Sequence, residues 1–181
     1  MEYKMSLVVK ALPLAALAML LVIAVYTDLR YGKIYNKLTF PCMAAGLALG
    51  FLGNGLFPEY GLKGLLQSLA GIGVVLGLYL LSFSKGIAGG DIKLMMAVGS
   101  LVGLRLTIWA ILFSAAIGGI LALIVMARYR TVRSTAKNLA THAYLKVVLR
   151  APVELAGGSR ANWFRYSPAI ALGTLLTLLI R

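Results

Sequence analysis

The sequence predicts an all-α protein that crosses a membrane as a bundle of about six transmembrane helices. Hydrophobic residues make up 61% of the 181 residues, whereas a soluble domain has roughly 45–50%. Charged residues make up only 13% and gather between long apolar runs, and a membrane-spanning helix needs about 20 mainly apolar residues. We therefore expect a single integral membrane domain over residues 1–181, with loops but no separate soluble domain.

Six apolar runs, separated by polar or glycine-rich stretches, mark the expected helices in chain order. The fourth and the sixth are shorter than a bilayer crossing normally requires, and tilt or local thinning of the bilayer would accommodate them. The runs extend from about Leu7 or Ala11 to Thr27, Leu38 to Leu56, Leu62 to Phe83, Asp91 to Gly103, Thr107 to Ala127 and Ser167 to Ile180. Small residues four positions apart suit close helix packing, and three such pairs are expected to hold the bundle together: Gly46/Gly50, Gly73/Gly77 and Ala115/Gly119.

The distribution of basic residues predicts the orientation in the cell's inner (cytoplasmic) membrane. If the loop after the first span is cytoplasmic and the spans alternate, 13 of the 18 basic residues lie inside, as the positive-inside rule requires. The N-terminus is then outside, and a basic loop at about 128–165 is cytoplasmic. The same rule explains the net charge of +13 more simply than nucleic-acid binding does, so no nucleic-acid partner is expected.

The basic segment from Arg128 to Arg165 allows two interpretations. Its apolar and basic residues fall on separate helical stripes, which indicates an amphipathic helix held at the membrane surface by anionic lipid. The alternative is a docking surface for a partner or substrate. Trp163, Phe164 and Tyr166 stand before the last span as an interfacial aromatic belt would.

The chain contains only two aspartates, Asp28 and Asp91, and both fall at the cytoplasmic ends of predicted spans. An ionisable group at the edge of a membrane span is costly, which makes it a functional candidate. If the two helices pack side by side, the two carboxyl groups share a proton, because both cannot easily ionise in a site of low dielectric constant. One can then activate water while the other polarises a carbonyl, as in aspartic proteases. The structural alternatives are a solvent-facing helix end for Asp28 and a helix N-cap for Asp91.

Other kinds of catalytic or metal site find little support. Cys42 is the only cysteine, which excludes a disulfide framework and a cysteine-rich zinc site. His142, the only histidine, stands in a basic segment without a nearby acidic partner, so no Ser/His/Asp set is expected. Glu59 falls in a loop on the predicted outer side. A divalent metal held by Asp28 and Asp91 alone would be poorly ligated, so we expect neither a metal nor a cofactor.

Three runs stand in order along the chain: D-L-R-Y-G-K-I-Y-N over residues 28–36, A-G-G-D-I-K-L from Ala88, and S-P-A-I-A-L-G over residues 167–173. The first two resemble the two catalytic motifs of the type IV prepilin peptidase family, and the third resembles the start of that family's last span. Members of this family are intramembrane aspartic proteases, and their second motif is a G-x-G-D signature. One departure is Ala88, which replaces the first glycine of the signature.

The resemblance implies roles for individual residues. Asp28 and Asp91 match the two catalytic aspartates of the family. Supporting positions follow from the same motifs: Asn36 in the first, and Gly90 and Lys93 in the second, with Gly89 expected to supply the flexibility that Ala88 lacks.

The resemblance also implies a substrate and partners. Family members cleave a short basic leader from pilin precursors on the cytoplasmic side, so the expected partners are a prepilin-like precursor, the lipid bilayer, and pilus assembly or secretion machinery. Larger bifunctional members add a domain with paired cysteines that methylates the new N-terminus. With a single cysteine, this chain is expected to be peptidase-only, similar to the short tight-adherence (Flp) peptidases.

Two other functions stay open at the level of sequence. A proton- or cation-coupled transporter could use the two aspartates to relay its ion, but it predicts further polar residues near the middle of the spans. A non-catalytic scaffold of a secretion complex predicts that both aspartates tolerate replacement.

Overall fold

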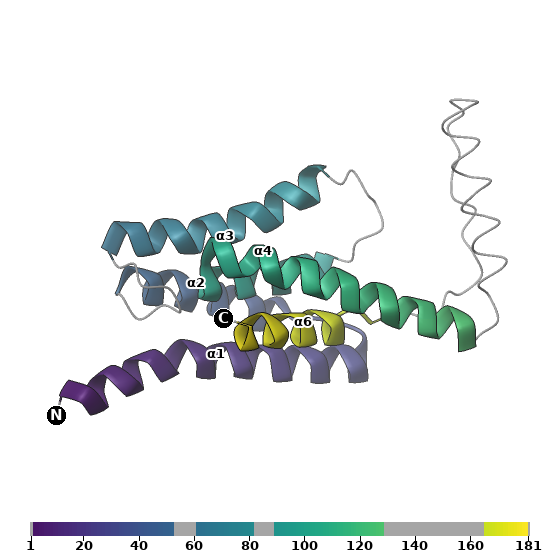
Figure 1. Ribbon diagram of the computed structural model, residues 1–181, viewed down its shortest axis with the longest axis horizontal. Coiled ribbons are helices and arrows are strands. Elements are labelled where there is room, and N and C mark those ends of the chain that lie inside the picture. Colours follow the sequence, from purple (N-terminus) through teal and green to yellow (C-terminus); the bar gives the residue numbers. More distant parts are fainter. Residues whose placement is uncertain (1, 53–60, 82–88, 129–164, 181) are drawn as a thin grey trace. The chain divides into compact units, whose positions relative to one another are not determined.

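The computed structural model describes residues 2–52, 61–81, 89–128 and 165–180, which are almost entirely α-helical (Figure 1). No strand occurs in these ranges, so the predicted all-α fold is confirmed. The helices are α1 (Glu2–Tyr31), α2 (Asn36–Phe51), α3 (Gly61–Leu81), α4 (Gly89–Arg128) and α6 (Ser167–Leu179).

The helices fall where the apolar runs predicted them. Within the described residues, three segments are long and apolar enough to cross a membrane, namely Leu12–Tyr31, Gly61–Leu81 and Gly89–Val125, and α6 is a shorter apolar helix. The predicted break between the fourth and fifth spans coincides with Gly103, whose φ of 76° interrupts the helical geometry of α4. A positive φ of this kind favours glycine because glycine has no Cβ atom. The total of six spans stays a prediction, as does the single domain.

The chain divides into two compact units, Met1–Ile117 with Arg165–Arg181, and Gly118–Phe164. Of the second unit, the structure describes only the end of α4. The predicted basic loop at 128–165 therefore lies almost wholly outside the described residues, as do Glu59, Ala88 and His142. All the contacts described below lie within the first unit.

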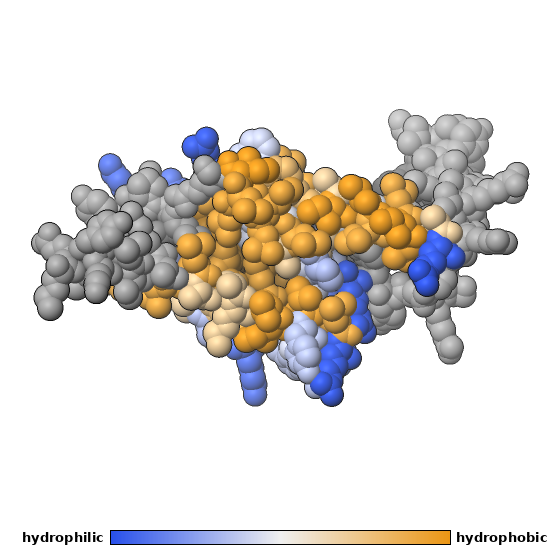
Figure 2. All heavy atoms as spheres, turned by 60° about the horizontal axis from the view of Figure 1, so that its bottom comes forward, coloured by the Kyte–Doolittle hydropathy of each residue, from blue (hydrophilic) through white to orange (hydrophobic). Residues whose placement is uncertain are grey.

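Apolar side chains occupy both the interior and the outer faces of the first unit. Buried positions in α1 recur with helical spacing at Leu17, Leu20, Leu21 and Ala24. The side chains on the outside are apolar as well, and they cover much of the face seen in Figure 2. A helix that is apolar on all sides is typical of a lipid environment. In a soluble protein, only the face toward the interior is apolar.

Close backbone contacts between small residues set the distance between the inner helices. Helix α2 packs against α3 and α1, and α6 packs against α1. A Cβ atom added at Gly46 would collide with Ser100 of α4, and one added at Gly71 of α3 would collide with the backbone of Gly99. In addition, the Ser68 hydroxyl donates to the Gly46 carbonyl oxygen at 3.2 Å. These contacts bring α4 against both α2 and α3.

The small-residue prediction is confirmed for Gly46 and wrong for Gly73 and Gly77. A Cβ atom at either of these two glycines would meet no described atom within 4 Å. Gly73 lies on the exposed side of α3, whereas Gly71, two positions earlier, lies on the buried side. Spacing alone identifies a face of small residues, but it does not say which face meets a neighbouring helix.

We expect Gly71→Ala to destabilise the protein by about 1–3 kcal/mol, because the added methyl group overpacks a backbone contact. Gly73→Ala is the matched control in the same helix, and we expect it to be neutral or stabilising by up to about 1 kcal/mol, since alanine favours helices over glycine. Unfolding followed in detergent micelles measures both. Equal stability of the two variants would contradict the contact between Gly71 and Gly99.

Candidate active site

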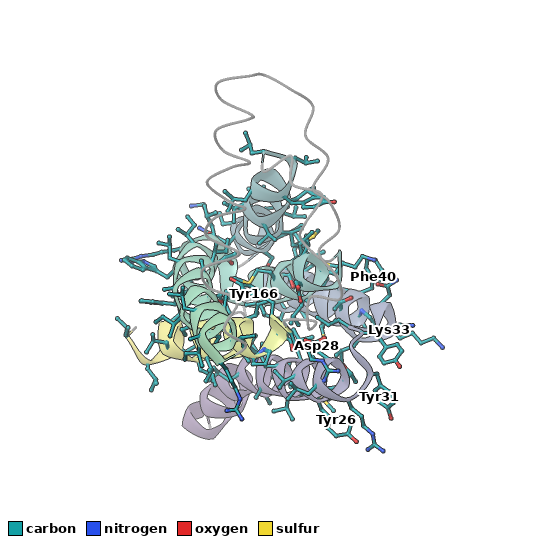
Figure 3. The ribbon with its side chains drawn as sticks, turned by 90° about the vertical axis from the view of Figure 1, so that its right-hand side faces the viewer. Tyr26, Asp28, Tyr31, Lys33, Phe40 and Tyr166 are labelled. Carbon is teal, nitrogen blue, oxygen red and sulfur yellow. The ribbon has the colours of Figure 1, made fainter. Side chains whose placement is uncertain are left out.

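The first predicted site residue, Asp28, lies in the last turn of α1 and is only 8% exposed. The helix ends at Gly32, whose φ of 64° is left-handed and whose N–H donates to the Asp28 carbonyl oxygen at 2.8 Å. This bond is the usual glycine cap of a helix C-terminus. Figure 3 shows Asp28 toward the interior of the bundle, while Tyr26 and Tyr31 point away from it.

The connection between α1 and α2 is short and brings the rest of the first motif back to the same end of the bundle. Only residues 32–35 separate the two helices. Tyr35 is extended, and its carbonyl oxygen accepts the N–H groups of Leu38 and Thr39 at the start of α2. Ile34 and Asn36 therefore lie within one short turn of the end of α1.

The second motif forms the first turn of α4, which begins at Gly89 and includes Asp91. A Cβ atom added at Gly90 would lie 3.2 Å from the Cβ atom of Ile34, so a side chain there would press on the first motif. Gly89 has no described atom within 4 Å of its Cβ position. Gly90 thus permits contact between the two motifs, whereas Gly89 lies away from the other described residues at the start of α4.

A hydrogen bond joins two of the predicted supporting residues. The Lys93 ammonium donates to Oδ1 of Asn36 at 2.9 Å, across 57 positions in the chain. The same ammonium lies 5.7 Å from the centre of the Phe40 ring in α2, within the range of a cation–π contact. Lys93 therefore ties the start of α4 to the start of α2.

Gly90 and Lys93, on either side of Asp91, both contact the first motif, which begins at Asp28, so the two aspartates lie at the same end of the bundle. Asp91 is half-buried, whereas Asp28 is buried. Tyr166, just before α6, belongs to the same group: burial and then the charge of Asp91 raise the pKa of its phenol. We predicted Tyr166 as part of an interfacial belt, but it is half-buried and its hydroxyl donates to the Ser114 carbonyl oxygen at 3.0 Å.

A residue that the sequence did not single out completes the site. Ser167, the first residue of α6, is fully buried, and its hydroxyl donates to Oδ2 of Asp28 at 2.5 Å. The S-P-A-I-A-L-G run had indicated only the start of a span. The sequence did show a serine at the start of a predicted helix. A serine in that position more commonly caps its own helix, so it did not indicate a contact with Asp28.

The described residues do not gather a metal site. No group of three or more His, Cys, Asp or Glu side chains occurs among them. Cys42 is a half-buried free thiol. The polar groups that meet here are two carboxyl groups, two hydroxyl groups, one amide and one ammonium, a set suited to moving protons at a carbonyl group.

The fold and the site define a protein of apolar helices in which two sequence motifs converge at one end of a bundle. Residues 15–123 match the model of the type IV leader peptidase family. Because this match covers more than half of the chain, the protein belongs to that family, and the predicted family is confirmed. Both aspartates lie within the matched range, whereas Ser167 lies beyond it. No curated protein and no solved structure matches the chain.

The contact between Lys93 and Asn36 predicts a measurable coupling. In a double-mutant cycle of Lys93→Met and Asn36→Ala, we expect a coupling energy of about 0.5–1 kcal/mol, because the bond is charged but largely exposed. Unfolding in detergent micelles of the parent, both single variants and the double variant supplies the four free energies. Strictly additive effects would show that the bond does not hold α4 to α2.

Proposed function

We propose that this chain is an aspartic endopeptidase that removes the leader peptide from type IV prepilin-like precursors, with Asp28 and Asp91 as its catalytic residues. Membership of the type IV leader peptidase family supports leader-peptide cleavage in general. The aspartic mechanism rests on the convergence of the two motifs. The motifs meet at two pairs of positions, Ile34 with Gly90 and Asn36 with Lys93, and Asp91 stands between Gly90 and Lys93 in the chain.

The proposed reaction is direct attack of water on the scissile carbonyl, without an acyl-enzyme. One carboxylate takes a proton from the water as it attacks, and the other carboxyl group donates its proton to the carbonyl oxygen. The tetrahedral intermediate then breaks its C–N bond: the leaving nitrogen takes up a proton from one carboxyl group, and a hydroxyl group of the intermediate returns a proton to the other carboxylate. This scheme needs two carboxyl groups near one another and no other nucleophile.

The supporting residues keep the geometry of the pair and leave room for substrate. Asn36 and Lys93 fix the first turn of α4 relative to α2, and Gly90 lets that turn approach Ile34. A helical peptide shields its own amide groups by hydrogen bonding, so a substrate helix must unwind before it is cut. None of the described atoms lies within 4 Å of a Cβ position at Gly89, which suits the approach of an extended substrate backbone.

Cleavage at the cytoplasmic face of the inner membrane, with the N-terminus outside, is the orientation that the basic residues favour. We further propose that these 181 residues carry only the peptidase activity, as in the short Flp type, because their single cysteine cannot supply paired cysteine motifs. A product with a free, unmethylated N-terminus is the corresponding expectation, and mass spectrometry of that product checks it.

Transport is less well supported than proteolysis. A transporter would need polar groups along its spans that are free to bind an ion. In the described helices, most buried hydroxyl groups instead donate to backbone carbonyl oxygens of their own or a neighbouring helix, among them Ser68, Ser100, Thr107, Thr174 and Thr177. Hydroxyl groups bonded in this way satisfy the backbone and do not form an ion path.

We expect Asp28→Asn and Asp91→Asn each to lower the cleavage rate at least about 100-fold, the loss typical of a missing acid or base. Both variants should fold, since asparagine keeps the size of aspartate. The measurement incubates the protein in detergent with candidate prepilins and maps the new N-terminus of the product. Glu59→Gln is the control, because Glu59 falls on the predicted outer side, and it should cleave normally.

Normal cleavage by either aspartate variant, at matched amounts of folded protein, would rule out the aspartic mechanism. Failure of the parent protein itself to cleave, with both aspartate variants as stable as the parent, would favour the scaffold interpretation. Ion uptake into vesicles by the purified protein, without proteolysis, would favour transport.

A further inference from the structure

The hydroxyl group of Ser167 serves a residue in another helix. Serine at the beginning of a helix usually accepts a backbone N–H of its own first turn. Helix α6 has no side-chain cap at Tyr166, and its first N–H groups, those of Ala169 and Ile170, bond to the Tyr166 carbonyl oxygen. The Ser167 hydroxyl donates to Oδ2 of Asp28, 139 positions earlier in the chain.

Packing of α6 fixes the position of this hydroxyl. Pro168 stands in the first turn of α6, where its fixed φ favours a helix start. One turn further on, a Cβ atom at Gly173 would collide with Ser114 of α4, so the two backbones are in contact. The Tyr166 hydroxyl bonds to the carbonyl oxygen of the same Ser114. The start of α6 is therefore held against α4 from both sides of Ser167.

We propose that Ser167 is a positioning residue for Asp28, an inference that rests on the catalytic role proposed for that aspartate. With Oδ2 held by the hydroxyl, the side chain of Asp28 keeps one orientation, and Oδ1 is left for the proposed reaction. Because Asp28 is only 8% exposed, solvent contributes little to that orientation. The third motif thereby takes part in the site through the first aspartate and does not touch the substrate.

The kinetic test compares Ser167→Ala with Ser68→Ala. Ser68 is the matched control, because it too is fully buried and its hydroxyl too bonds across helices, to the Gly46 carbonyl oxygen. We expect Ser167→Ala to lower kcat for prepilin cleavage roughly 10- to 100-fold, the factor that corresponds to a lost hydrogen bond to a charged group, with KM unchanged. Ser68→Ala should lower thermal stability to a similar extent and leave kcat near that of the parent.

A spectroscopic test does not depend on activity. The chain has only two aspartates, so ¹³C labelling of aspartate carboxyl groups in the Asp91→Asn protein leaves a single labelled side chain, that of Asp28. We expect the infrared band of this group to shift when Ser167→Ala is added and to stay in place when Ser68→Ala is added. An unmoved band in the Ser167→Ala protein would overturn the proposal.

The two tests separate failure of this inference from failure of the proposed function. If Ser167→Ala cleaves at the parent kcat while Asp28→Asn is inactive, the positioning role is wrong and the aspartic peptidase stands. If the parent cleaves no prepilin, the proposed function fails, and the infrared band still decides whether Ser167 orients Asp28. A loss of kcat that Ser68→Ala reproduces at equal stability would also overturn the proposal.

Discussion

A carboxyl group buried in a bundle of apolar helices is the constraint on which the site depends. Asp28 is 8% exposed, and an uncompensated charge in such surroundings costs several kcal/mol. It also stands near the C-terminus of α1, where the partial negative charge of the helix end disfavours an anion. The surroundings must therefore supply hydrogen-bond donors, and one comes from another helix: the hydroxyl group of Ser167 at the start of α6. The first turn of α4, which carries Asp91, lies at the same end of the bundle.

Glycines at the points of contact make this arrangement possible. Gly99 of α4 lies against the backbone of Gly71, and Gly90 lies against Ile34, so α4 is held close to its neighbours at two points, nine residues apart. Asp91 follows Gly90 directly, so the same approach sets its distance from the first motif. A larger residue at either glycine would push α4 outward and move the second carboxyl group away from the first. The hydrogen bond from the Lys93 ammonium to Asn36 also holds the first turn of α4 against α2.

Much of this could be predicted from the sequence. The apolar runs gave the helices, because length and composition decide whether a segment can lie in lipid. The family motifs predicted that Asp28 and Asp91 belong together, and Asn36 and Lys93, which those motifs singled out separately, lie in contact. Packing was less predictable: Gly73 and Gly77 have the expected spacing but no neighbour, while Gly71 and Gly99 make the contact. The roles of Ser167 and Tyr166 were missed because both depend on partners more than 50 positions away, which local patterns do not reveal.

The two aspartates have unequal surroundings, and this inequality bears on the proposed mechanism. Asp28 is buried at the end of one helix and accepts a hydrogen bond from Ser167, whereas Asp91 is half-buried in the first turn of another helix, where the helix dipole favours negative charge. A pair of identical carboxyl groups in identical surroundings would have no reason to divide the roles of acid and base. Pairs in enzymes divide these roles when their environments differ. Here the difference arises from the fold itself, because one aspartate ends α1 and the other begins α4, and Ser167 bonds to only the first of them.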